Sequence, residues 1–472
     1  MLYFEVDKSD TTSYIYKQIY EKIKEQIMSQ KLRTEEKLPS KRELAKLLDV
    51  SINSVALAYE QLLAEGYIYS EERKGYFVEN ITQLSSEAQN HPFHNFPEEL
   101  IEKETHRDGW LSLSHIDVNI SKFPFKEWVK CQNQALKTFK HELGGIPHPQ
   151  GPYIVREEIA RLIGLTRNVV CRPEQIIIGP GTQNLIRQIM NLEDQQTKTA
   201  VENPGYFRFH QLLKNMNFPV SMIPLDRHGI SIEKVKELNP DYLFITPSHQ
   251  FPTGTIMPIS RRIELLNWAS AADDRYIVED DYDSEFKYGT DSIPSLHSLD
   301  RNQRVIYSGT FSKTLFPSLR ISYIVVPIEL LKKYKKQNAN WIQGSNLLNL
   351  YTLYFFLKSG EYARHIKRMN HYYETKRKKL IEELKHQFQD KMAIQDIPAG
   401  LHFLAYFKTE RTYEDVTSRA NQLKLEIYTI HRFLLEGLSE QEQGSICLVI
   451  GFASLRDQDI KESVSRLAEC VG

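Results

Sequence analysis

Short apolar segments alternate with longer amphipathic segments after residue 110, and this alternation constrains the fold more than any other feature of the chain. Residues 155–165 repeat their apolar side chains at the helical period. The apolar runs that we expect to form strands are residues 175–178, 242–246, 276–278, 304–307 and 321–326. Strands that are buried on both faces read as continuous apolar runs. The pattern therefore predicts an α/β domain with a mainly parallel sheet covered by helices.

The first 80 residues are expected to fold separately, beginning with two helices. An apolar stripe predicts the first helix over residues 14–28, and it consists of Ile15, Ile19, Ile23 and Ile27. Ser40 and Glu43 have the spacing of a capping box, in which each side chain bonds the other residue's backbone amide, and they predict the start of a second helix. The residues that this helix is expected to bury are Leu44, Leu47 and Leu48.

A third helix and a hairpin are predicted next. Ser51 can cap a helix that runs to Glu65, and Gly66 can end it. Residues 67–70 and 75–78 have the composition of short strands, joined by a charged turn. This order of elements is that of a winged helix-turn-helix, in which the third helix enters the major groove of DNA.

The stretch LPSKRELAKLLDVSINSVALAYEQLLAEGYIYSEERKGYFV resembles the DNA-binding domain of the GntR family. The resemblance implies that the groove is contacted by Lys41, Arg42, Ser51, Asn53 and Ser54, and that the wing contacts DNA through Arg73, Lys74 and Gly75. Arg42 can bind phosphate or guanine in a bidentate manner. The first 80 residues hold 12 Lys and Arg against 14 Asp and Glu, so the positive charge must be local. A winged helix that docks onto a protein is the alternative.

Length and composition suggest the domain plan. A chain of 472 residues is too long for one ordinary domain. We expect a DNA-binding domain at residues 1–80, a polar linker at 81–110 and a large domain at 111–472. Because the chain has neither a long apolar run nor a secretion signal, we expect a cytoplasmic protein without a membrane partner. The four cysteines lack metal-ligand or redox spacing, which favours reduced thiols and no metal site.

Side chains suited to cofactor chemistry follow the predicted strands of the large domain, where ligands of parallel sheets bind. Gly179 to Gln183 precede a helix whose free amides suit a phosphate. An acidic stretch at 279–283 follows another strand, and Lys313 lies seven residues before Arg320. Taken singly, each has a plain alternative: a tight turn without a ligand, a solvated loop or metal site, and a surface lysine.

The order of the motifs is more specific than any one of them. GPGTQ, NPGY, PSHQFPTG, EDDYDSEF and SGTFSKTLFPSLR occur in sequence. Together they resemble the fold-type I pyridoxal-phosphate aminotransferases over residues 111–472. The resemblance implies that Lys313 forms an internal aldimine, that Asp280 pairs with the pyridine nitrogen, and that Tyr282 bonds the phenolic oxygen. It also implies that Tyr206 lies against the ring. The implied phosphate ligands are Gly181, Thr182, Thr310, Ser312 and Arg320.

Two departures from the aminotransferase pattern bear on function. The chain reads Gln-Phe-Pro-Thr-Gly at 250–254 where aminotransferases commonly read Asn-Pro-Thr-Gly. The usual asparagine contact with the cofactor is therefore lost, or it is taken over by Gln250 or His249. The stretch 447–452 lacks the arginine that enzymes for α-amino acids usually carry before the Gly-Phe pair. An α-amino acid would lose its carboxylate anchor.

A GntR-type winged helix joined to this domain is the layout of the MocR regulators, and the chain resembles their γ-aminobutyrate-responsive GabR type. The stretches TPSHQFPTGTIMPISRRIELLNWA and RYIVEDDYDSEF contribute to this resemblance. It implies that Arg208 and Arg432 bind the effector carboxylate, and that γ-aminobutyrate or a similar ω-amino acid forms an external aldimine in exchange with Lys313. It further implies a head-to-tail homodimer that acts at promoter DNA and activates genes for γ-aminobutyrate use. Alternatively, the two arginines are structural.

Three functional hypotheses follow. We expect a pyridoxal-phosphate-dependent, γ-aminobutyrate-responsive DNA-binding transcription regulator. The alternative is a catalytically active aminotransferase with a fused DNA-binding domain, because the residues for the first half-reaction are all present: Lys313, Asp280, Tyr282 and Arg320. A third hypothesis is a repressor whose cofactor is only structural, and it predicts DNA binding that is indifferent to amino acids.

Overall fold

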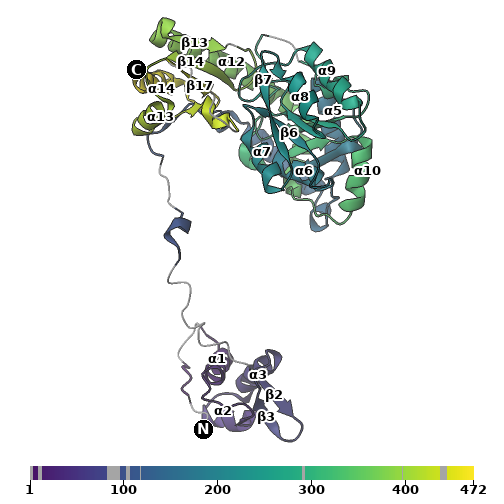
Figure 1. Ribbon diagram of the computed structural model, residues 1–472. Coiled ribbons are helices and arrows are strands. Elements are labelled where there is room, and N and C mark those ends of the chain that lie inside the picture. Colours follow the sequence, from purple (N-terminus) through teal and green to yellow (C-terminus); the bar gives the residue numbers. More distant parts are fainter. Residues whose placement is uncertain are drawn as a thin grey trace. The chain divides into compact units, whose positions relative to one another are not determined.

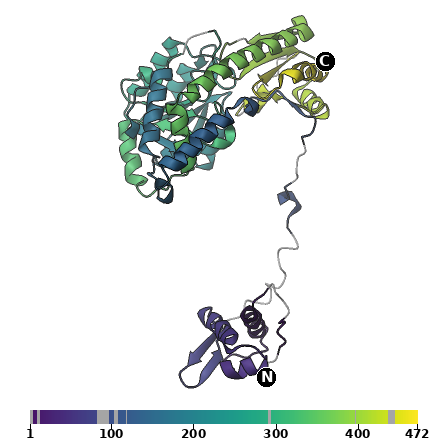
Figure 2. The ribbon, with the colours of Figure 1, turned by 180° about the vertical axis from the view of Figure 1, so that it is seen from behind.

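The chain divides into two compact units, Met1–His106 and Arg107–Gly472. The computed structural model, drawn in Figure 1 and from behind in Figure 2, describes residues 4–8, 13–81, 96–102, 107–116, 118–289, 293–395, 397–435 and 444–472. Most of the predicted linker at 81–110 lies outside the described residues. Within those ranges, no helix has the length and apolar character needed to cross a membrane.

The described residues of the smaller unit form three α-helices, the 3-10 helix Glu98–Leu100 and a small antiparallel sheet. The helices are α1 (Ile15–Met28), α2 (Lys41–Leu47) and α3 (Ile52–Ala64). The strands β1 (Lys37–Leu38), β2 (Ile68–Glu71) and β3 (Gly75–Val78) pair in the order β1-β3-β2. The predicted capping box is confirmed, because Ser40 N donates to Glu43 Oε2 over 2.8 Å and Glu43 N donates to Ser40 Oγ over 3.3 Å.

One core residue of this unit was predicted wrongly. Leu44 and Leu48 are buried, but Leu47 is 38% exposed. Successive helical residues are rotated by about 100°. Leu47 is therefore turned away from Leu48, while Leu44, Ala45 and Leu48 share the face that packs into the core.

An eight-stranded sheet forms the centre of the larger unit. Its strand order is β5-β12-β11-β10-β9-β6-β7-β8. Strand β12 runs antiparallel to both of its neighbours, β7 pairs antiparallel with β8, and the other pairings are parallel. The strands are β5 (Ile176–Gly179), β6 (Thr199–Asn203), β7 (Val220–Asp226), β8 (Gly229–Ile230), β9 (Tyr242–Ile245), β10 (Tyr276–Asp281), β11 (Val305–Thr310) and β12 (Ser322–Val325). The prediction of a mainly parallel α/β sheet is confirmed.

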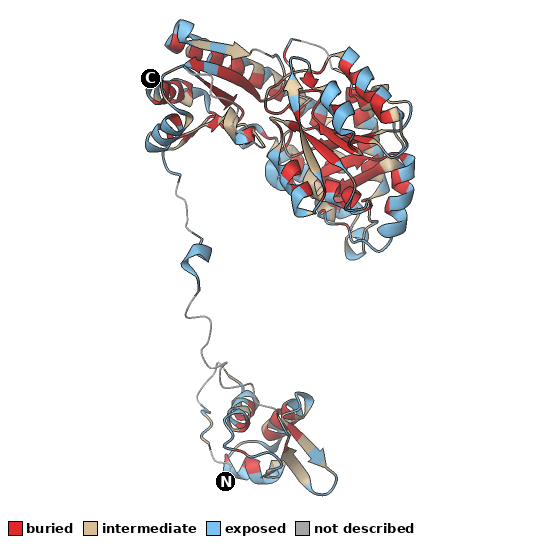
Figure 3. Cartoon of the chain, in the orientation of Figure 1, coloured by how far each residue is buried: buried red, intermediate tan, exposed pale blue. Residues whose placement is uncertain are grey.

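Helices cover both faces of this sheet. Alternate residues of β10 pack into different clusters: Val278 packs with α6 and α7, whereas Ile277 packs with α8 and α9. Figure 3 shows that buried residues concentrate on the strands of this sheet. The helices of this part are α4 (Phe125–Thr138), α5 (Tyr153–Arg167), α6 (Thr182–Met190), α7 (Phe207–Asn215), α8 (Ile232–Leu238), α9 (Ile259–Ser270), α10 (Ile328–Gln337) and α11 (Leu347–Lys358).

The C-terminal part packs a second sheet against helices. Its four antiparallel strands run in the order β13-β14-β17-β16. They are β13 (Met392–Gln395), β14 (His402–Lys408), β16 (Tyr428–Thr429) and β17 (Ser445–Gly451). The helices are α12 (Glu361–Phe388), α13 (Tyr413–Gln422) and α14 (Ile460–Val471), and a separate parallel pair joins β4 (Leu111–Ser112) to β15 (Leu425–Glu426).

Strand β10 is longer than predicted. The prediction ended it at Val278, but the strand continues to Asp281 and pairs with β11 as far as Gly309. Carboxylates are tolerated here because each finds a partner: Glu279 accepts from the amides of Leu296 and His297, and Asp281 pairs with Arg167.

Candidate functional site

A cavity of about 220 Å³ opens beyond the carboxyl ends of the central strands. This is where ligands bind in open α/β sheets. All eleven side chains or glycines predicted to bind a cofactor or effector line it: Gly181, Thr182, Tyr206, Arg208, Asp280, Tyr282, Thr310, Ser312, Lys313, Arg320 and Arg432. Loops after separate strands therefore bring together residues that are far apart in the sequence.

One end of the cavity is suited to a phosphate group. The first helical residue of α6 is Thr182, so the free amides at this terminus face the cavity. Gly181 has φ +138°, and a Cβ atom placed there would lie 2.2 Å from Nη2 of Arg320. Arg320 itself is held at φ +53°, which is uncommon for a residue with a side chain. The missing methyl group and the arginine leave a positively charged cradle of anion size.

Asp280 lies at the buried side of the same cavity. Its Oδ1 accepts a hydrogen bond of 3.0 Å from Ser308 Oγ. Burial raises the pKa of the Asp280 carboxyl to about 7, with Asp281 and Asp283 adding to the effect and Ser308 opposing it. A buried carboxylate needs a cationic or donor partner. A protonated ring nitrogen at this position would supply one, so the residues fit a pyridine-based cofactor.

The Lys313 amine is held at the cavity by main-chain carbonyls. Its Nζ donates to His115 O over 2.7 Å and to Ile116 O over 2.8 Å. The segment that supplies them follows β4. Burial lowers the pKa of the His115 imidazole to about 3, and the nearby charges of Lys313, Arg432 and Arg208 lower it further. His115 is therefore neutral, and it does not add a positive charge beside the lysine amine.

Aromatic side chains form another part of the cavity lining. The rings of Tyr206 and Tyr282 each lie 5.9 Å from that of Phe251, with interplanar angles of 89° and 90°. The Tyr282 hydroxyl also lies 3.0 Å from Nδ1 of His249. A flat ring could rest against these side chains.

The two arginines predicted for the effector come from different elements. Arg208 lies in the first turn of α7, and Arg432 lies in the 3-10 helix Ile430–Phe433, with its Cζ 4.5 Å from the centre of the Tyr428 ring. Both side chains are exposed and both line the cavity. The positive charge of each lowers the pKa of the nearby His115 imidazole. The arrangement can bind a carboxylate at a distance from the Lys313 amine.

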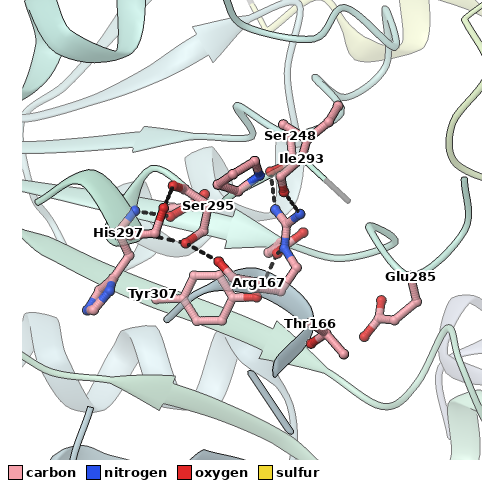
Figure 4. Close-up of polar contacts among 12 residues, drawn as sticks. Thr166, Arg167, Ser248, Glu285, Ile293, Ser295, His297 and Tyr307 are labelled. Carbon is pink, nitrogen blue, oxygen red and sulfur yellow. Dashed lines mark hydrogen bonds and ion pairs between the residues drawn. The ribbon is translucent and has the colours of Figure 1, made fainter. Parts of the chain in front are cut away.

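A buried polar network surrounds Arg167 (Figure 4) and includes Asp281, the neighbour of Asp280 in β10. Arg167 Nε donates to Asp281 Oδ2 over 2.6 Å, and the guanidinium also donates to Ser248 Oγ and to the carbonyl of Ile293. Tyr307 donates to the same Asp281 oxygen over 2.6 Å. These bonds tie α5, β10, β11 and the loop after β9 together, which holds Asp280 in position.

The sequence predicts that the usual asparagine contact is lost or is taken over by Gln250 or His249. The Gln250 amide donates to the carbonyls of Pro204 and Phe251 and accepts from Thr253, so it stabilises its own loop and joins it to the loop after β6. Gln250 is not among the residues that line the cavity. His249 does not line it either, but its ring contacts Tyr282, which does.

The predicted DNA-contacting residues lie on α2, α3 and the β2–β3 turn. Arg42, Asn53, Arg73 and Lys74 are exposed. Several are engaged within the unit. Lys74 Nζ lies 2.7 Å from Glu71 Oε2, Lys41 Nζ lies 5.5 Å from the centre of the Tyr76 ring, and the hydroxyl oxygens of Ser51 and Ser54 lie 2.8 Å apart. Ser51 also accepts from the Ser54 amide and caps α3.

Sequence reasoning missed several residues of the site. They are His115, Ile116, Thr246, Phe251, Asp283, His402 and Phe433. His115 and Ile116 contribute backbone carbonyls, which leave no side-chain pattern. Asp283 and His402 are polar residues that the fold buries. Asp283 belongs to the acidic stretch at 279–283, which was the signal for it in the sequence, whereas His402 lies outside the motifs.

Both parts of the chain match known families. The family described as Aminotransferase class I and II matches residues 110–466, and the gntR family of bacterial regulatory proteins matches residues 15–78. The chain is 36% identical to the uncharacterized HTH-type transcriptional regulator YdeL of Bacillus subtilis, with 96% of each chain covered. It is 30% identical to the probable rhizopine catabolism regulatory protein MocR of Rhizobium meliloti, which covers 96% of this chain and 93% of the relative.

Solved structures agree on the fold of the larger unit. The kynurenine aminotransferase of Pyrococcus horikoshii, crystallised with PMP, superposes with a TM-score of 0.68 at 21% identity, and the match covers 81% of this chain and 98% of that one. The predicted fold class, a GntR-type winged helix plus a fold-type I aminotransferase domain, is thereby confirmed. Homologues with this fold depend on pyridoxal phosphate.

Proposed function

The chain belongs to the aminotransferase class I and II family and carries a GntR-family DNA-binding segment, and on that premise we propose that it is a transcription regulator that responds to γ-aminobutyrate or a similar ω-amino acid. Its homologues include MocR-type regulators. The observation that carries the proposal is the single cavity that holds Lys313, Asp280 and Arg320 together with two arginines from other elements.

Pyridoxal phosphate, when bound, supplies an aldehyde that condenses with amines and a ring that withdraws electrons. The residues of this chain that would hold the phosphate are Arg320, Gly181, Thr182, Thr310 and Ser312. The Asp280 carboxylate would accept a hydrogen bond from the protonated ring nitrogen. Lys313 supplies the amine with which an incoming ligand amine competes. Tyr206 and Tyr282 limit the movement of the ring.

Arg208 and Arg432 select the effector by binding its carboxylate. Both lie at the exposed part of the cavity, and β17 offers no arginine before Gly451 to grip an α-carboxylate. An ω-amino acid spans the separation because its amine and its carboxylate are several bonds apart. Ligand binding changes DNA binding only if the two DNA-binding states have different affinities for the ligand.

The DNA-binding unit acts through α3 and the wing, in a head-to-tail homodimer that activates genes for γ-aminobutyrate use. Arg42, Arg73 and Lys74 are exposed and can neutralise phosphates. We expect Arg42→Ala to weaken promoter binding and to reduce the slope of log affinity against log salt by about 1. Fluorescence anisotropy with promoter DNA at several salt concentrations measures this. An unchanged slope would argue against a phosphate contact by Arg42.

The visible absorption spectrum of the protein loaded with pyridoxal phosphate tests the proposal directly. We expect a visible band that shifts when γ-aminobutyrate is added and that then persists. α-Amino acids should leave the band nearly unchanged, because β17 has no arginine to bind their α-carboxylate. A protein that forms no visible band with the cofactor would contradict the assignment of the site.

Arginine variants test the effector site separately. We expect Arg208→Gln and Arg432→Gln each to raise the γ-aminobutyrate concentration for half-maximal response at least roughly tenfold, because each removes a charge-assisted bond of about 1.5 kcal/mol or more. The visible band before addition should stay the same. Arg301→Gln, which alters an exposed arginine before β11 that does not line the cavity, serves as the matched control.

A catalytically active aminotransferase is the second candidate. It is favoured by the presence of Lys313, Asp280, Tyr282 and Arg320 in one cavity. This function predicts that the visible band is lost on incubation with an amino donor and restored by an oxo-acid. A band that shifts and persists through repeated additions favours the regulator.

A further inference from the structure

His249 contacts Tyr282 but does not itself line the cavity. Its Nδ1 lies 3.0 Å from the Tyr282 hydroxyl, and 3.2 Å and 3.1 Å from the two carboxylate oxygens of Asp283. The side chains of His249 and Asp283 are only 3% and 2% exposed. Nδ1 of His249 therefore faces three oxygen atoms in a buried setting. It can either donate one hydrogen or accept one, but it cannot do both.

The neighbours decide where the hydrogens lie. As a carboxylate, Asp283 offers only acceptors, so a lone pair on Nδ1 would face its two oxygens without a bonding hydrogen. Nδ1 must therefore carry the proton and donate it to Asp283. A protonated Nδ1 cannot accept from Tyr282. The tyrosine O–H is left to point elsewhere, and Tyr282 lines the cofactor cavity whereas His249 does not.

The surroundings of the other imidazole nitrogen bear on which of the two nitrogens carries the hydrogen. Within the described ranges, Nε2 of His249 is buried and makes no hydrogen bond. A second N–H at that position would be an unsatisfied buried donor, which costs more than an unused acceptor lone pair. The ring of His402 lies 4.9 Å away, and its own Nε2 lies 3.1 Å from the carbonyl of Pro252.

Close packing holds the imidazole in this orientation. A Cβ atom on Gly400 would lie 2.0 Å from its Cε1 and 2.6 Å from Asp283 Oδ2. A Cβ on Gly254 would lie 3.2 Å from its Nε2. Ser248, which precedes His249 in the chain, accepts a hydrogen bond from the Arg167 guanidinium. The main chain at Gly400 and Gly254 therefore packs directly against the edge of the imidazole ring.

From this geometry we infer that His249 and Asp283 are a positioning pair that keeps the Tyr282 hydroxyl as a hydrogen-bond donor directed into the cofactor cavity. The inference rests on the proposed function, because the acceptor is the ring oxygen of the bound cofactor. Burial raises the pKa of the Tyr282 hydroxyl well above its usual value, and the nearby carboxyl groups of Asp283, Asp280, Glu202 and Asp281 act in the same direction. The hydroxyl therefore keeps its proton.

The readout is the pH midpoint of the visible absorption change of the cofactor-loaded protein. A hydrogen bond donated to the ring oxygen stabilises its anionic form and favours release of the proton held beside it. In His249→Leu, Asp283 loses its donor and the Tyr282 hydroxyl turns to it. We expect the midpoint to rise by about 0.5 to 1 pH unit, the effect of one hydrogen bond.

Further variants separate positioning from general damage. Asp283→Asn is nearly isosteric and removes the need for a hydrogen on Nδ1, so the midpoint should rise as in His249→Leu. His249→Asn keeps an N–H donor near the Nδ1 position and should restore the midpoint of the original protein. Thermal unfolding of each loaded variant checks that it is folded, and the midpoint is compared only among folded variants.

Tyr282→Phe closes the thermodynamic cycle. It should raise the midpoint by itself, and His249→Leu in that background should add almost nothing, because both changes remove the same bond. Equal shifts with and without the Tyr282 hydroxyl would overturn the inference, as would an unshifted midpoint in both His249→Leu and Asp283→Asn. Absence of a visible band in the unsubstituted protein would instead contradict the proposed function.

Discussion

At the scale of single residues, the phosphate end of the cavity depends on a missing methyl group. Gly181 combines φ +138° with a position where a Cβ would meet the Arg320 guanidinium. Other glycines, such as Gly289, also have positive φ, but nothing lies within 4 Å of the position of their Cβ. Backbone strain and loss of the cradle can therefore be separated.

We expect Gly181→Ala to weaken pyridoxal-phosphate binding by roughly tenfold or more, because displacement of Arg320 removes a charge-assisted bond of about 1.5 kcal/mol or more. Titration of the visible band measures the affinity. Gly289→Ala should strain the backbone by about 1 kcal/mol without changing it. Equal losses in the two variants would mean that strain alone is responsible.

At the scale of elements, side-chain caps define where the helices of the DNA-binding unit begin. Both α2 and α3 start with a serine whose hydroxyl accepts from the amide three residues later, Ser40 from Glu43 and Ser51 from Ser54. Ser51 is also a predicted DNA contact, so a substitution there could affect both the cap and DNA binding. Ser40 is not a predicted contact and therefore tests the cap alone.

Substitution Ser40→Ala should destabilise α2 by about 1 kcal/mol, because a backbone amide loses its acceptor. Hydrogen exchange of the amides at the start of α2 should become faster, while the visible spectrum of the cofactor stays the same. Ser29→Ala, at the end of α1, is the control and should have little effect. Unchanged protection of α2 would contradict the role of the cap.

Strand β10 depends on a buried ion pair in the same way. Arg167 and Asp281 are 5% and 2% exposed, and their atoms lie 2.6 Å apart. Arg167→Leu should lower the free energy of unfolding by about 3 kcal/mol or more, because a buried carboxylate is left without its cation. Denaturant unfolding measures this. Adding Asp281→Asn should recover part of the loss, and a purely additive double variant would argue against the pairing.

At the scale of the whole molecule, the larger unit buries several carboxyl groups that favour the protonated form. Burial raises the pKa values of Glu202, Glu279, Asp280 and Glu285 to about 7 each. A carboxyl with a raised pKa in the folded chain holds its proton more tightly there than in the unfolded chain. Its contribution to stability is present at low pH and is lost as the pH rises through about 7.

The cofactor-free protein should therefore unfold at a lower temperature at about pH 8 than at about pH 5.5. Asp280→Asn should reduce this dependence, whereas Asp274→Asn, which alters an exposed carboxyl, should not. Pyridoxal phosphate should raise the unfolding temperature more at the higher pH, because its ring cation pairs with ionised Asp280. Differential scanning fluorimetry checks the trend, and a stability that rises with pH would contradict it.

Much of the fold could be predicted because local patterns carried it. The capping box at Ser40, the apolar stripe of α1 and the continuous apolar strands β5, β9 and β12 depend on neighbouring residues, and they formed as expected. Strands β6 and β7 were not predicted, since their sequences mix polar and apolar residues and their burial depends on the surrounding helices. Leu47 was misassigned for a related reason: the apolar side of a short helix is decided by its partners.

The sequence by itself determined many of the elements, the order of the motifs and the residue types of the cavity. Only the tertiary structure decided that the carbonyls of His115 and Ile116 hold the Lys313 amine. It also decided that the Gln250 amide bonds main-chain carbonyls and that His249 contacts Tyr282. Local patterns arise from the geometry of adjacent residues. Contacts between the ends of different strands, in contrast, depend on the order in which the strands assemble into the sheet. A local sequence pattern does not contain this order.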